Sequence, residues 1–470
     1  MENFSEPTVM KFGGTSVEDA RAFERVASIV RSKESAHPVV VVSAMSRFTD
    51  ALLESVRVAA EEGDAQSAAL ILEDHFARHL DVAQNLLAAE QAAMVERAIE
   101  SERREISELL RIVASHPVTR PPLQDEIVAY GERLSSFLLA EVLRRSGLQA
   151  QYVDARKCIL TDDTYGNAAP LIAETEARTR DTLGPLLEAS LIPVIGGFIA
   201  STVSGATTTL GRGGSDYTAA LVGAALRARE VLIWTDVTGV LTADPRVVAA
   251  ARTISRLSYA EAAELAYFGA KVLHPKTIQP AIEKGIAVRI CNSRAPAESG
   301  TLIRAEAERH ARAVKAIAHK TGITTVQITS GRMLGAYGFL RSLFEVFERH
   351  RTAVDVVATS EVSVSLSLDD TDALDVIEQD LNLIGAVKVE RDRAIICVVG
   401  EGLRNTPGIA AKVFTAVRNI NVMLISQGAS SINLTFVVEE DAVEQAVKQL
   451  HQAFFERDTR ELYQTAMLDQ

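Results

Sequence analysis

Two glycine-bearing clusters in the chain carry residue types suited to binding phosphate. Residues 11–16 read Lys-Phe-Gly-Gly-Thr-Ser and follow a short apolar run that precedes helical spacing. Adjacent glycines let backbone N–H groups approach an anion closely, a helix N-terminus favours negative charge, and Lys11 adds a cation. The cluster lacks the Gly-Lys-Ser/Thr ending of a Walker loop, so by itself it is equally well explained as an ordinary strand-to-helix turn.

The second cluster indicates an anion site more strongly. Residues 207–217 read Thr-Thr-Thr-Leu-Gly-Arg-Gly-Gly-Ser-Asp-Tyr, again between strand-like and helical segments. Only 27 glycines occur among the 470 residues, so three within four positions exceed what a turn requires. Ser215 and Asp216 are also residue types that can cap the helix that follows.

A third group of polar residues follows another apolar run. Residues 234–239 read Trp-Thr-Asp-Val-Thr-Gly, and Ala-Asp-Pro-Arg (243–246) and Phe-Gly-Ala-Lys-Val-Leu-His-Pro (268–275) come later. Ligands of open α/β sheets bind at the carboxyl ends of strands, so a Thr-Asp pair there is well placed for a nucleotide. The alternatives are an ordinary Asp-Pro turn and a solvated helix lysine at Lys271.

Strands and helices must alternate to position these clusters. Short apolar, β-branched runs predict buried strands at 9–12, 39–43, 192–195 and 231–235, with another near Val153. Helical segments separate them, which predicts a mostly parallel sheet covered on both faces. Between these strands lies a long stretch rich in Ala, Leu, Glu and Arg without proline, which predicts a helical insertion.

The last third of the chain repeats one order of elements. The predicted order is strand, helix, strand, strand, and each copy has a glycine just before its helix, Gly338 or Gly408. The predicted elements are 323–329, 338–350, 354–358 and 362–368 in the first copy, and 395–399, 408–418, 422–426 and 432–438 in the second. This self-similarity predicts a duplicated ferredoxin-like module, whose second copy ends in a helix at 442–454.

Composition excludes several other classes of protein. The net charge of -13, with 62 acidic and 49 basic residues, argues against nucleic-acid binding and against a membrane-surface role. The three cysteines lie far apart, so they indicate neither a metal knuckle nor a disulfide framework. The polar, acidic start is unlike a signal peptide, and no apolar run approaches the roughly 20 residues that span a bilayer. We expect a cytoplasmic protein.

His75 and His79, four apart on a predicted helix, are expected to be a surface pair without a metal.

Taken together, the three clusters and the duplicated tail resemble the aspartate kinase family, from Val9 to about Phe454. The resemblance implies the amino-acid kinase fold, an α/β fold with a mostly parallel sheet sandwiched by helices, followed by two ferredoxin-like α+β ACT domains. It implies these boundaries: a catalytic domain at 1–308 with its helical insertion at about 50–118, a first ACT domain at 315–390, and a second at 391–470 to which residues 315–321 contribute a strand.

The resemblance also implies a reaction. Aspartate kinases transfer the γ-phosphoryl group of ATP to L-aspartate, giving 4-phospho-L-aspartate and ADP, at the start of the pathway to lysine, threonine, methionine and diaminopimelate. The β-carboxylate, with a pKa near ~3.9, is already ionised at neutral pH, so the reaction needs positioning and cations rather than a general base. Lys11 is implied as the electrostatic catalyst and Asp216 as the residue that orients it. Mg²⁺ is expected to be held mainly by the nucleotide.

The binding residues are carried over from the family motifs. Those implied for ATP are Lys11, Gly13, Gly14, Ser16, Thr235, Asp236, Arg246 and Lys271. Those implied for aspartate are Ser43, Thr49, Glu132, Phe198, Arg212, Gly213, Gly214 and Ser215. Glu132 supplies an acid for the substrate ammonium and Arg212 a fork-shaped cation for the α-carboxylate; without the resemblance, Glu132 would be interpreted as a helix-start residue. Leu241 departs from a tyrosine expected in the family.

The repeat is implied to bind an inhibitory amino acid. The positions concerned are Met333, Gly338, Phe339, Leu340, Asp355, Thr359, Ser360 and Glu361. Lysine is the expected inhibitor and threonine the alternative, because Ala336 and Tyr337 depart from the more polar loop of lysine-sensitive members. Propensity alone would make Asp355 a solvated strand end. Exposed ACT sheet edges predict a homodimer or higher homo-oligomer.

Two other functions remain open. A different amino-acid kinase, acting on glutamate, acetylglutamate or carbamate, would share the fold, but the 268–275 motif and the duplicated tail count against it. A non-catalytic amino-acid sensor could also keep the fold. The charged positions implied for catalysis are intact, which counts against the sensor.

Overall fold

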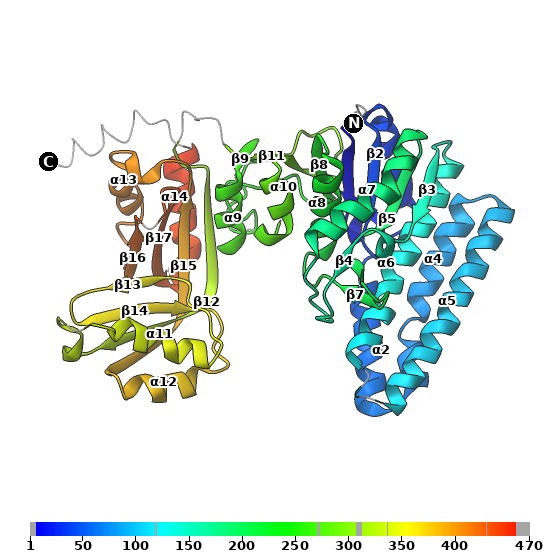
Figure 1. Cartoon of the computed structure of the whole chain (residues 1–470). Helices are drawn as coiled ribbons and strands as arrows, with labels where there is room; N and C mark the ends of the chain where they lie inside the picture. Colours follow the sequence, from blue (N-terminus) through cyan, green and yellow to red (C-terminus); the bar gives the residue numbers. More distant parts are fainter. Residues whose placement is uncertain are drawn as a thin grey trace. The chain divides into compact units, whose positions relative to one another are not determined.

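The computed structural model describes residues 6–116, 118, 120–269, 273–306, 313–335, 337–428 and 430–456 (Figure 1). The chain divides into two compact units. The first comprises Met1–Val240, Ser255–Tyr259 and Val272–Glu306, and the second comprises Leu241–Ile254, Ala260–Lys271 and Ala307–Gln470. Two segments of the predicted catalytic region, within residues 241–271, therefore pack with the C-terminal unit.

The first unit is built on an eight-stranded sheet, as far as its residues are described. The strand order is β3-β5-β2-β1-β8-β10-β11-β9, and neighbours pair in parallel except β10 and β11. The strands are β1 (Thr8–Phe12), β2 (Pro38–Val42), β3 (Ala150–Val153), β5 (Ile192–Gly196), β8 (Glu230–Thr235), β9 (Arg256–Ser258), β10 (Ala287–Asn292) and β11 (Thr301–Arg304). A smaller sheet contains β4 (Leu160–Thr161), β6 (Ile199–Thr202) and β7 (Thr207–Thr209).

Helices cover both faces of the large sheet, as its continuously apolar strands require. On one face lie α1 (Ala20–Ser32) and α6 (Arg120–Arg145), and on the other α7 (Ile172–Glu188) and α8 (Gly214–Leu226) (Figure 1). Shorter helical segments are η1 (Gly14–Val17), η2 (Glu34–Ala36), η4 (Ala155–Lys157), η5 (Pro275–Ile278) and α10 (Gln279–Glu283). The carboxyl ends of β1, β2, β5 and β8 meet at one edge of this sandwich.

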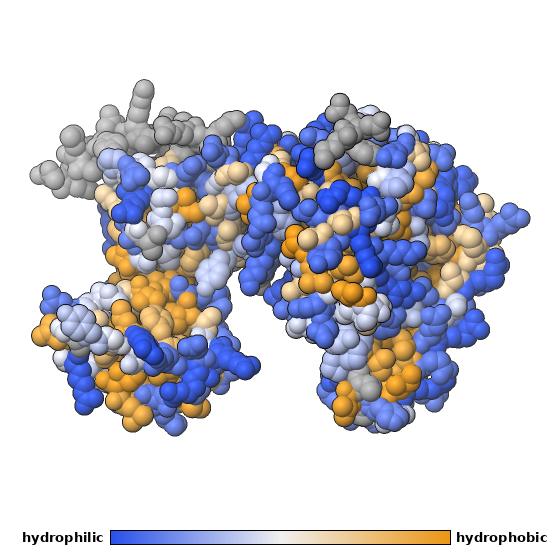
Figure 2. Space-filling model, in the orientation of Figure 1, coloured by the Kyte–Doolittle hydropathy of each residue, from blue (hydrophilic) through white to orange (hydrophobic). Residues whose placement is uncertain are grey.

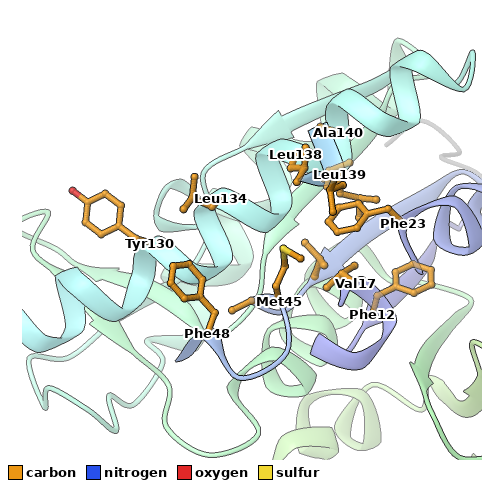
Figure 3. Close-up of a cluster of buried hydrophobic side chains, with 14 of the residues drawn as sticks. Phe12, Val17, Phe23, Met45, Phe48, Tyr130, Leu134, Leu138, Leu139 and Ala140 are labelled. Atoms are coloured by element: carbon orange, nitrogen blue, oxygen red, sulfur yellow. The ribbon is translucent and has the colours of Figure 1, made fainter. Parts of the chain in front are cut away.

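The stretch predicted as a helical insertion folds into helices that share one core with the sheet. They are α2 (Phe48–Glu62), α3 (Ala65–Leu70), α4 (Glu73–Leu86) and α5 (Ala89–Ser115), followed by α6. Figure 3 shows Phe48 and Met45 beneath α6, with Phe48 below Leu134 and Met45 between Phe48 and Phe12. The prediction of a surface histidine pair is wrong for His79, which is fully buried against the Phe48 ring.

The second unit is built on a six-stranded antiparallel sheet within its described residues. Its order is β13-β14-β12-β15-β17-β16. The strands are β12 (Ala316–Thr329), β13 (Val357–Thr359), β14 (Ser363–Leu368), β15 (Ala386–Val399), β16 (Leu424–Gln427) and β17 (Asn433–Glu439). The helical segments are α9 (Tyr259–Tyr267), η6 (Gly331–Met333), α11 (Phe339–Arg349), α12 (Leu374–Asn382), η7 (Leu403–Asn405), α13 (Ile409–Ala416), η8 (Glu440–Ala442), α14 (Val443–His451) and a π-helical turn (Gln452–Glu456).

The duplication appears as two cores on one shared sheet. One core packs α11 and α12 on β12 and β14, and the other packs α13 and α14 on β15 and β17. Gly338 and Gly408 precede α11 and α13 with φ of 87° and 82°, a backbone conformation that glycine adopts without strain. The start of β12, Ala316–Lys320, pairs with Ile395–Val399 of the second copy. In the described part of the chain, no helix is long and apolar enough to cross a membrane.

Candidate active site

Lys11 lies at the carboxyl end of β1 and faces α8. Side chains alternate along a strand, so Met10 and Phe12 point into the core on the α6 side while Lys11 points to the other face. Its Nζ atom is 2.8 Å from Oδ1 of Asp216, in the first turn of α8, and the two side chains are only 12% and 16% exposed. The two glycine clusters, distant in sequence, therefore meet at one ion pair, as the predicted pairing of Lys11 with Asp216 requires.

Glycines allow the loops around this ion pair to approach one another. A Cβ atom on Gly14 would lie 2.9 Å from the Ala44 oxygen, and one on Gly214 would lie 2.7 Å from the Phe198 ring. Gly213 has φ of 75° and is the N-cap of α8, so Ser215 and Asp216, which could have capped this helix, do not cap it. The N-terminus of α8 thus has no side-chain cap and favours an anion.

The loops after β1, β8 and β10 form the neighbouring part of the site. Thr235 ends β8, and its hydroxyl donates to Oδ1 of the exposed Asp236 at 3.2 Å. Ser293, after β10, donates its backbone N–H to the Thr235 oxygen at 2.8 Å. The buried hydroxyl of Ser16 donates to Oγ of Ser293 at 2.9 Å. Ser16 therefore holds the loops together, and its hydroxyl proton is already engaged.

Glu132 is a buried carboxylate on α6 beside these loops. Oε1 accepts the backbone N–H of Ala44 at 3.2 Å, whereas Oε2 has no hydrogen-bond partner in the described residues. Burial raises the pKa of Glu132 to about 8, although the Ala44 N–H and the Lys11 charge oppose the shift. Because α6 begins at Arg120, Glu132 is not a helix-start residue. Burying an acidic oxygen without a partner costs free energy, and a ligand that supplies a hydrogen-bond donor or a positive charge would offset this cost.

The end of β2 is held between β1 and α6. The backbone N–H of Ser43 donates to the Phe12 oxygen at 3.0 Å, and the Ser43 oxygen accepts the Ser135 hydroxyl at 2.8 Å. Thr49 is half-buried in the first turn of α2, after Arg47 with φ of 65°. This loop therefore brings Ser43 to the same strand-end edge as Lys11.

Phe198 follows β5 in a strained backbone conformation. Its φ is 65°, and its N–H donates to Oγ1 of Thr218 on α8 at 3.0 Å. Non-glycine residues adopt this conformation rarely, and such strain is concentrated at functional sites. The neighbouring Gly197 leaves room for Ser215, whose Cβ would lie 2.6 Å from a Cβ on that glycine. The end of β5 thus packs directly against the first turn of α8.

The remaining predicted cations have different positions. Arg212 is exposed in the loop before α8 and makes no ion pair or side-chain hydrogen bond with any described residue. Arg246 belongs to the second unit, where its side chain is 86% exposed and its guanidinium lies 2.6 Å from Oδ2 of Asp244. Lys271 lies outside the described residues. Arg212 belongs to the first unit and directly precedes the start of α8.

Sequence and structure comparisons identify the family. Residues 6–292, more than half of the chain, match the amino acid kinase family, and residues 396–454 match an ACT domain. The chain is 40% identical over 467 residues to the lysine-sensitive aspartokinase 3 of Escherichia coli, covering 96% of this chain and all of that protein. The chain belongs to the aspartokinase family. A chloroplastic aspartokinase 3 of Arabidopsis thaliana is also 40% identical, over 466 residues, 96% of this chain and 82% of that one.

Solved aspartokinase structures agree with this family membership. Escherichia coli aspartokinase III in complex with aspartate and ADP matches with a TM-score of 0.81 and 39% identity over 96% of this chain and all of that one. The same enzyme with lysine and aspartate matches with a TM-score of 0.80, with the same identity and coverage. The predicted fold class is confirmed. Aspartokinases are nucleotide-using kinases with a carboxyl acceptor, and this chain is an aspartate kinase with C-terminal ACT domains.

Asp355 is the regulatory residue with the most informative surroundings. Its side chain is only 2% exposed, so the interpretation as a solvated strand end is wrong. The Tyr267 hydroxyl donates to Oδ1, and the Lys320 ammonium lies 3.6 Å from the same oxygen and 2.5 Å from Asp369. Oδ2 has no hydrogen-bond partner among the residues described. Burial raises the pKa of Asp355, against the lowering effects of Tyr267 and Lys320.

The other predicted regulatory positions lie in two neighbouring segments. Met333 ends η6, Gly338 is the N-cap of α11, and Phe339 and Leu340 begin that helix. Thr359 ends β13, and Ser360 and Glu361 form the turn to β14. Ser330, just before η6, donates its N–H to the Val362 oxygen at 2.8 Å, which brings the two segments side by side. Tyr337 is fully exposed, and Ala336 lies outside the described residues.

Sequence reasoning missed several residues that support these sites. Ser293 joins the loops after β1 and β10 through its hydrogen bond with Ser16, and Tyr267 and Lys320 surround Asp355. Each acts through a partner far away in sequence, so no local pattern marks it. Tyr267 is the one with a usable signal, because it directly precedes the 268–275 motif.

Proposed function

We propose that Lys11, Asp216 and Glu132 form the centre at which this kinase phosphorylates the β-carboxylate of L-aspartate. The observation that carries the proposal is the Lys11–Asp216 ion pair where both glycine clusters meet, beside a buried Glu132 oxygen without a partner. The aspartate and ADP in the matched E. coli structure give the ligand classes.

The reaction requires electrostatic help rather than proton transfer. A β-carboxylate oxygen forms a bond to the γ-phosphorus while the bond between that phosphorus and the β–γ bridging oxygen breaks, which releases ADP. The attacking carboxylate is ionised at neutral pH, so no proton needs to be removed. Two anionic groups must instead be brought together, and Lys11 offsets their repulsion at the transferring phosphoryl group. Asp216 fixes the direction of the Lys11 ammonium.

Two residues recognise the α-carbon substituents of aspartate. The substrate ammonium pairs with Glu132, and its charge compensates the cost of ionising a carboxyl that burial keeps largely neutral. The exposed guanidinium of Arg212 is free to bind the α-carboxylate in a bidentate manner. Ser43, Thr49, Phe198 and the first turn of α8 complete the pocket.

The nucleotide binds along the ends of β1 and β8. Gly13 and Gly14 give its phosphates access to backbone N–H groups, and Thr235 and Asp236 hold the adenosine. No cluster of three or more acidic, histidine or cysteine side chains in the described residues forms a metal cage. The expected Mg²⁺ would be held mainly by the nucleotide, and when bound it would supply charge neutralisation.

A coupled assay with ATP, Mg²⁺ and L-aspartate tests the proposal. Lys11→Ala is expected to lower kcat by about a thousandfold while circular dichroism stays unchanged. Lys33→Ala, at an exposed lysine after α1, is the matched control and should keep full activity. Turnover of glutamate, acetylglutamate or carbamate instead of aspartate would reveal a different amino-acid kinase. Amino-acid binding without turnover would reveal a sensor.

We further infer that lysine inhibits the enzyme through Asp355. A buried carboxylate with a free oxygen, already beside the Lys320 ammonium, is chemically suited to a cationic side chain. Inhibition would then act by shifting the population between active and inhibited arrangements. The lysine-sensitive E. coli relative supports this choice. Dose–response curves with lysine, threonine and both distinguish the inhibitors, and inhibition by threonine alone would contradict the inference.

We also propose that the active form is a homodimer through the first ACT copy. β13 is an edge strand, and apolar side chains around it are exposed, as Figure 2 shows over β13, β14 and α11. The exposed set includes Leu334, Tyr337, Leu340, Val357 and Val362. Light scattering should give twice the chain mass, and Val357→Lys should shift it toward the monomer.

A further inference from the structure

Helix α6 carries a second buried carboxylate, Asp125, that the proposed chemistry does not use. Asp125 is 2% exposed and precedes Glu132 by seven residues, about two helical turns, so both project from the same side of α6. A buried acid needs partners to offset the loss of water. The partners of Asp125 show which part of the molecule it holds.

In the described residues, the side-chain hydrogen bonds of Asp125 go to one strand end and one turn. Oδ2 accepts the backbone N–H of Thr209 at 2.8 Å and that of Gly166 at 2.9 Å, and Oδ1 accepts the Thr209 hydroxyl at 3.1 Å. The backbone of Ala168 also donates to the Thr209 oxygen at 2.9 Å. Asp125 therefore ties the end of β7 and the 164–168 turn to α6.

The backbone between this anchor and Arg212, which follows Thr209 by three residues, is also constrained. The backbone N–H of Leu210 donates to the Phe198 oxygen at 2.9 Å. Gly211 has φ of 71°, and its missing Cβ would lie 2.6 Å from Oδ1 of Asn167. The chain from Thr209 to Arg212 is therefore held on both sides, and its position relative to α6 depends on Asp125.

We propose that Asp125 is a positioning residue for the amino-acid substrate, because it fixes the distance between Glu132 and Arg212. The inference rests on the roles proposed for those two residues as partners of the ammonium and the α-carboxylate. Both substrate groups are attached to one carbon atom, so their spacing cannot adapt to a displaced loop. The nucleotide is held by other loops, after β1 and β8, which Asp125 does not touch.

The consequence is a selective kinetic effect. Asp125→Ala should raise KM for aspartate by about tenfold or more, because the strand end that leads to Arg212 loses two hydrogen bonds and the 164–168 turn packed against it loses one. We expect kcat and KM for ATP to stay within about twofold. Asp125→Asn should restore most of the affinity, since its amide oxygen can accept both backbone N–H groups and its NH₂ can donate to the Thr209 hydroxyl.

The control variant is Asp162→Ala. Asp162 accepts backbone N–H groups of Thr164 and Ala169 around the same turn but makes no bond to β7. Its KM for aspartate should be unchanged. Thermal unfolding of each variant checks that the fold is intact. If Asp125→Ala does not fold, Thr209→Val replaces it in the test, because this variant removes only the hydroxyl bond. Its KM for aspartate is expected to rise about two- to threefold at constant kcat.

Glu132→Gln and Arg212→Ala are measured in parallel. If both raise KM for aspartate while Asp125→Ala and Thr209→Val do not, the positioning role is refuted and the binding roles stand. A parallel loss of kcat and both KM values in Asp125→Ala, without rescue by Asp125→Asn, also refutes it. If Glu132→Gln and Arg212→Ala leave KM unchanged, the binding roles are wrong and the positioning role falls with them.

Discussion

The affinity of the enzyme for aspartate should rise with pH because of Glu132. Burial raises the pKa of this carboxyl to about 8, so at pH 7, one unit below, only about one tenth of the free enzyme has it ionised. Binding of the substrate ammonium needs the ionised form, and the apparent affinity is reduced by the ionised fraction. KM for aspartate should therefore fall about tenfold per pH unit below about 8 and then level off.

Initial rates between about pH 6 and 8.5 measure this dependence, because the substrate keeps its ammonium and both carboxylates in that range. At saturating aspartate, kcat should vary little, since the bound ammonium keeps Glu132 ionised and no general base is needed. Glu132→Gln should raise KM at pH 8 by at least about thirtyfold, because a buried charge pair is lost. Its KM should no longer depend on pH. A flat wild-type profile, or an unchanged slope in the variant, would refute the reasoning.

The same pKa shift makes Glu132 costly for stability. The folded state favours the neutral acid, so the free energy of unfolding falls between the unfolded pKa of 4.5 and the folded pKa of about 8, by up to about 4 kcal/mol. Glu132→Gln removes this loss. Thermal unfolding of the variant should match the wild type near pH 4 and exceed it at pH 8, whereas a less stable variant at pH 8 would contradict the assignment of burial as the cause.

Three further predictions concern other parts of the chain. Thr218→Val removes the acceptor of the strained Phe198 N–H and should cost about 1–3 kcal/mol in the free energy of unfolding and raise KM for aspartate; an unchanged denaturation curve would contradict it. Gly197→Ala places a Cβ 2.6 Å from that of Ser215 and should lower activity at least about tenfold without changing regulation by lysine; full activity would show that the loop can move. Asp355→Ala should abolish lysine inhibition while kcat survives, and unchanged dose–response curves would exclude Asp355 as the inhibitor contact.

Local sequence patterns predicted the parts of the site that depend on backbone. Apolar runs followed by glycines marked the ends of β1 and β8 and the start of α8, and β1 begins one residue before its predicted start. The pairing of Lys11 with Asp216 came from the family motifs. No local pattern states that two loops about two hundred residues apart must meet.

The surroundings of individual side chains depend on tertiary contacts, which local sequence patterns could not predict. Glu132 was assigned correctly to a helix but as its start, because the helix continues N-terminally through a segment rich in proline and polar residues. Propensity alone would place Asp355 in solvent, yet Tyr267 and Lys320 enclose it. Ser215 could have capped α8, but a glycine with positive φ occupies the N-cap position. In each case a residue distant in sequence, or an alternative backbone geometry, prevailed over local propensity.

The shared strand β12 limits how the regulatory half can be divided. Its first part completes the second ACT copy and its second part completes the first, and β15 crosses in the opposite direction. Shortening the chain after residue 390 would strip Ala316–Lys320 of its neighbour and expose an unsatisfied backbone ladder. The two ACT copies therefore cannot be separated, and a truncated or grafted protein must contain both copies or neither. Because β12 and β15 run through both copies, a displacement of one copy is transmitted to the other along continuous backbone.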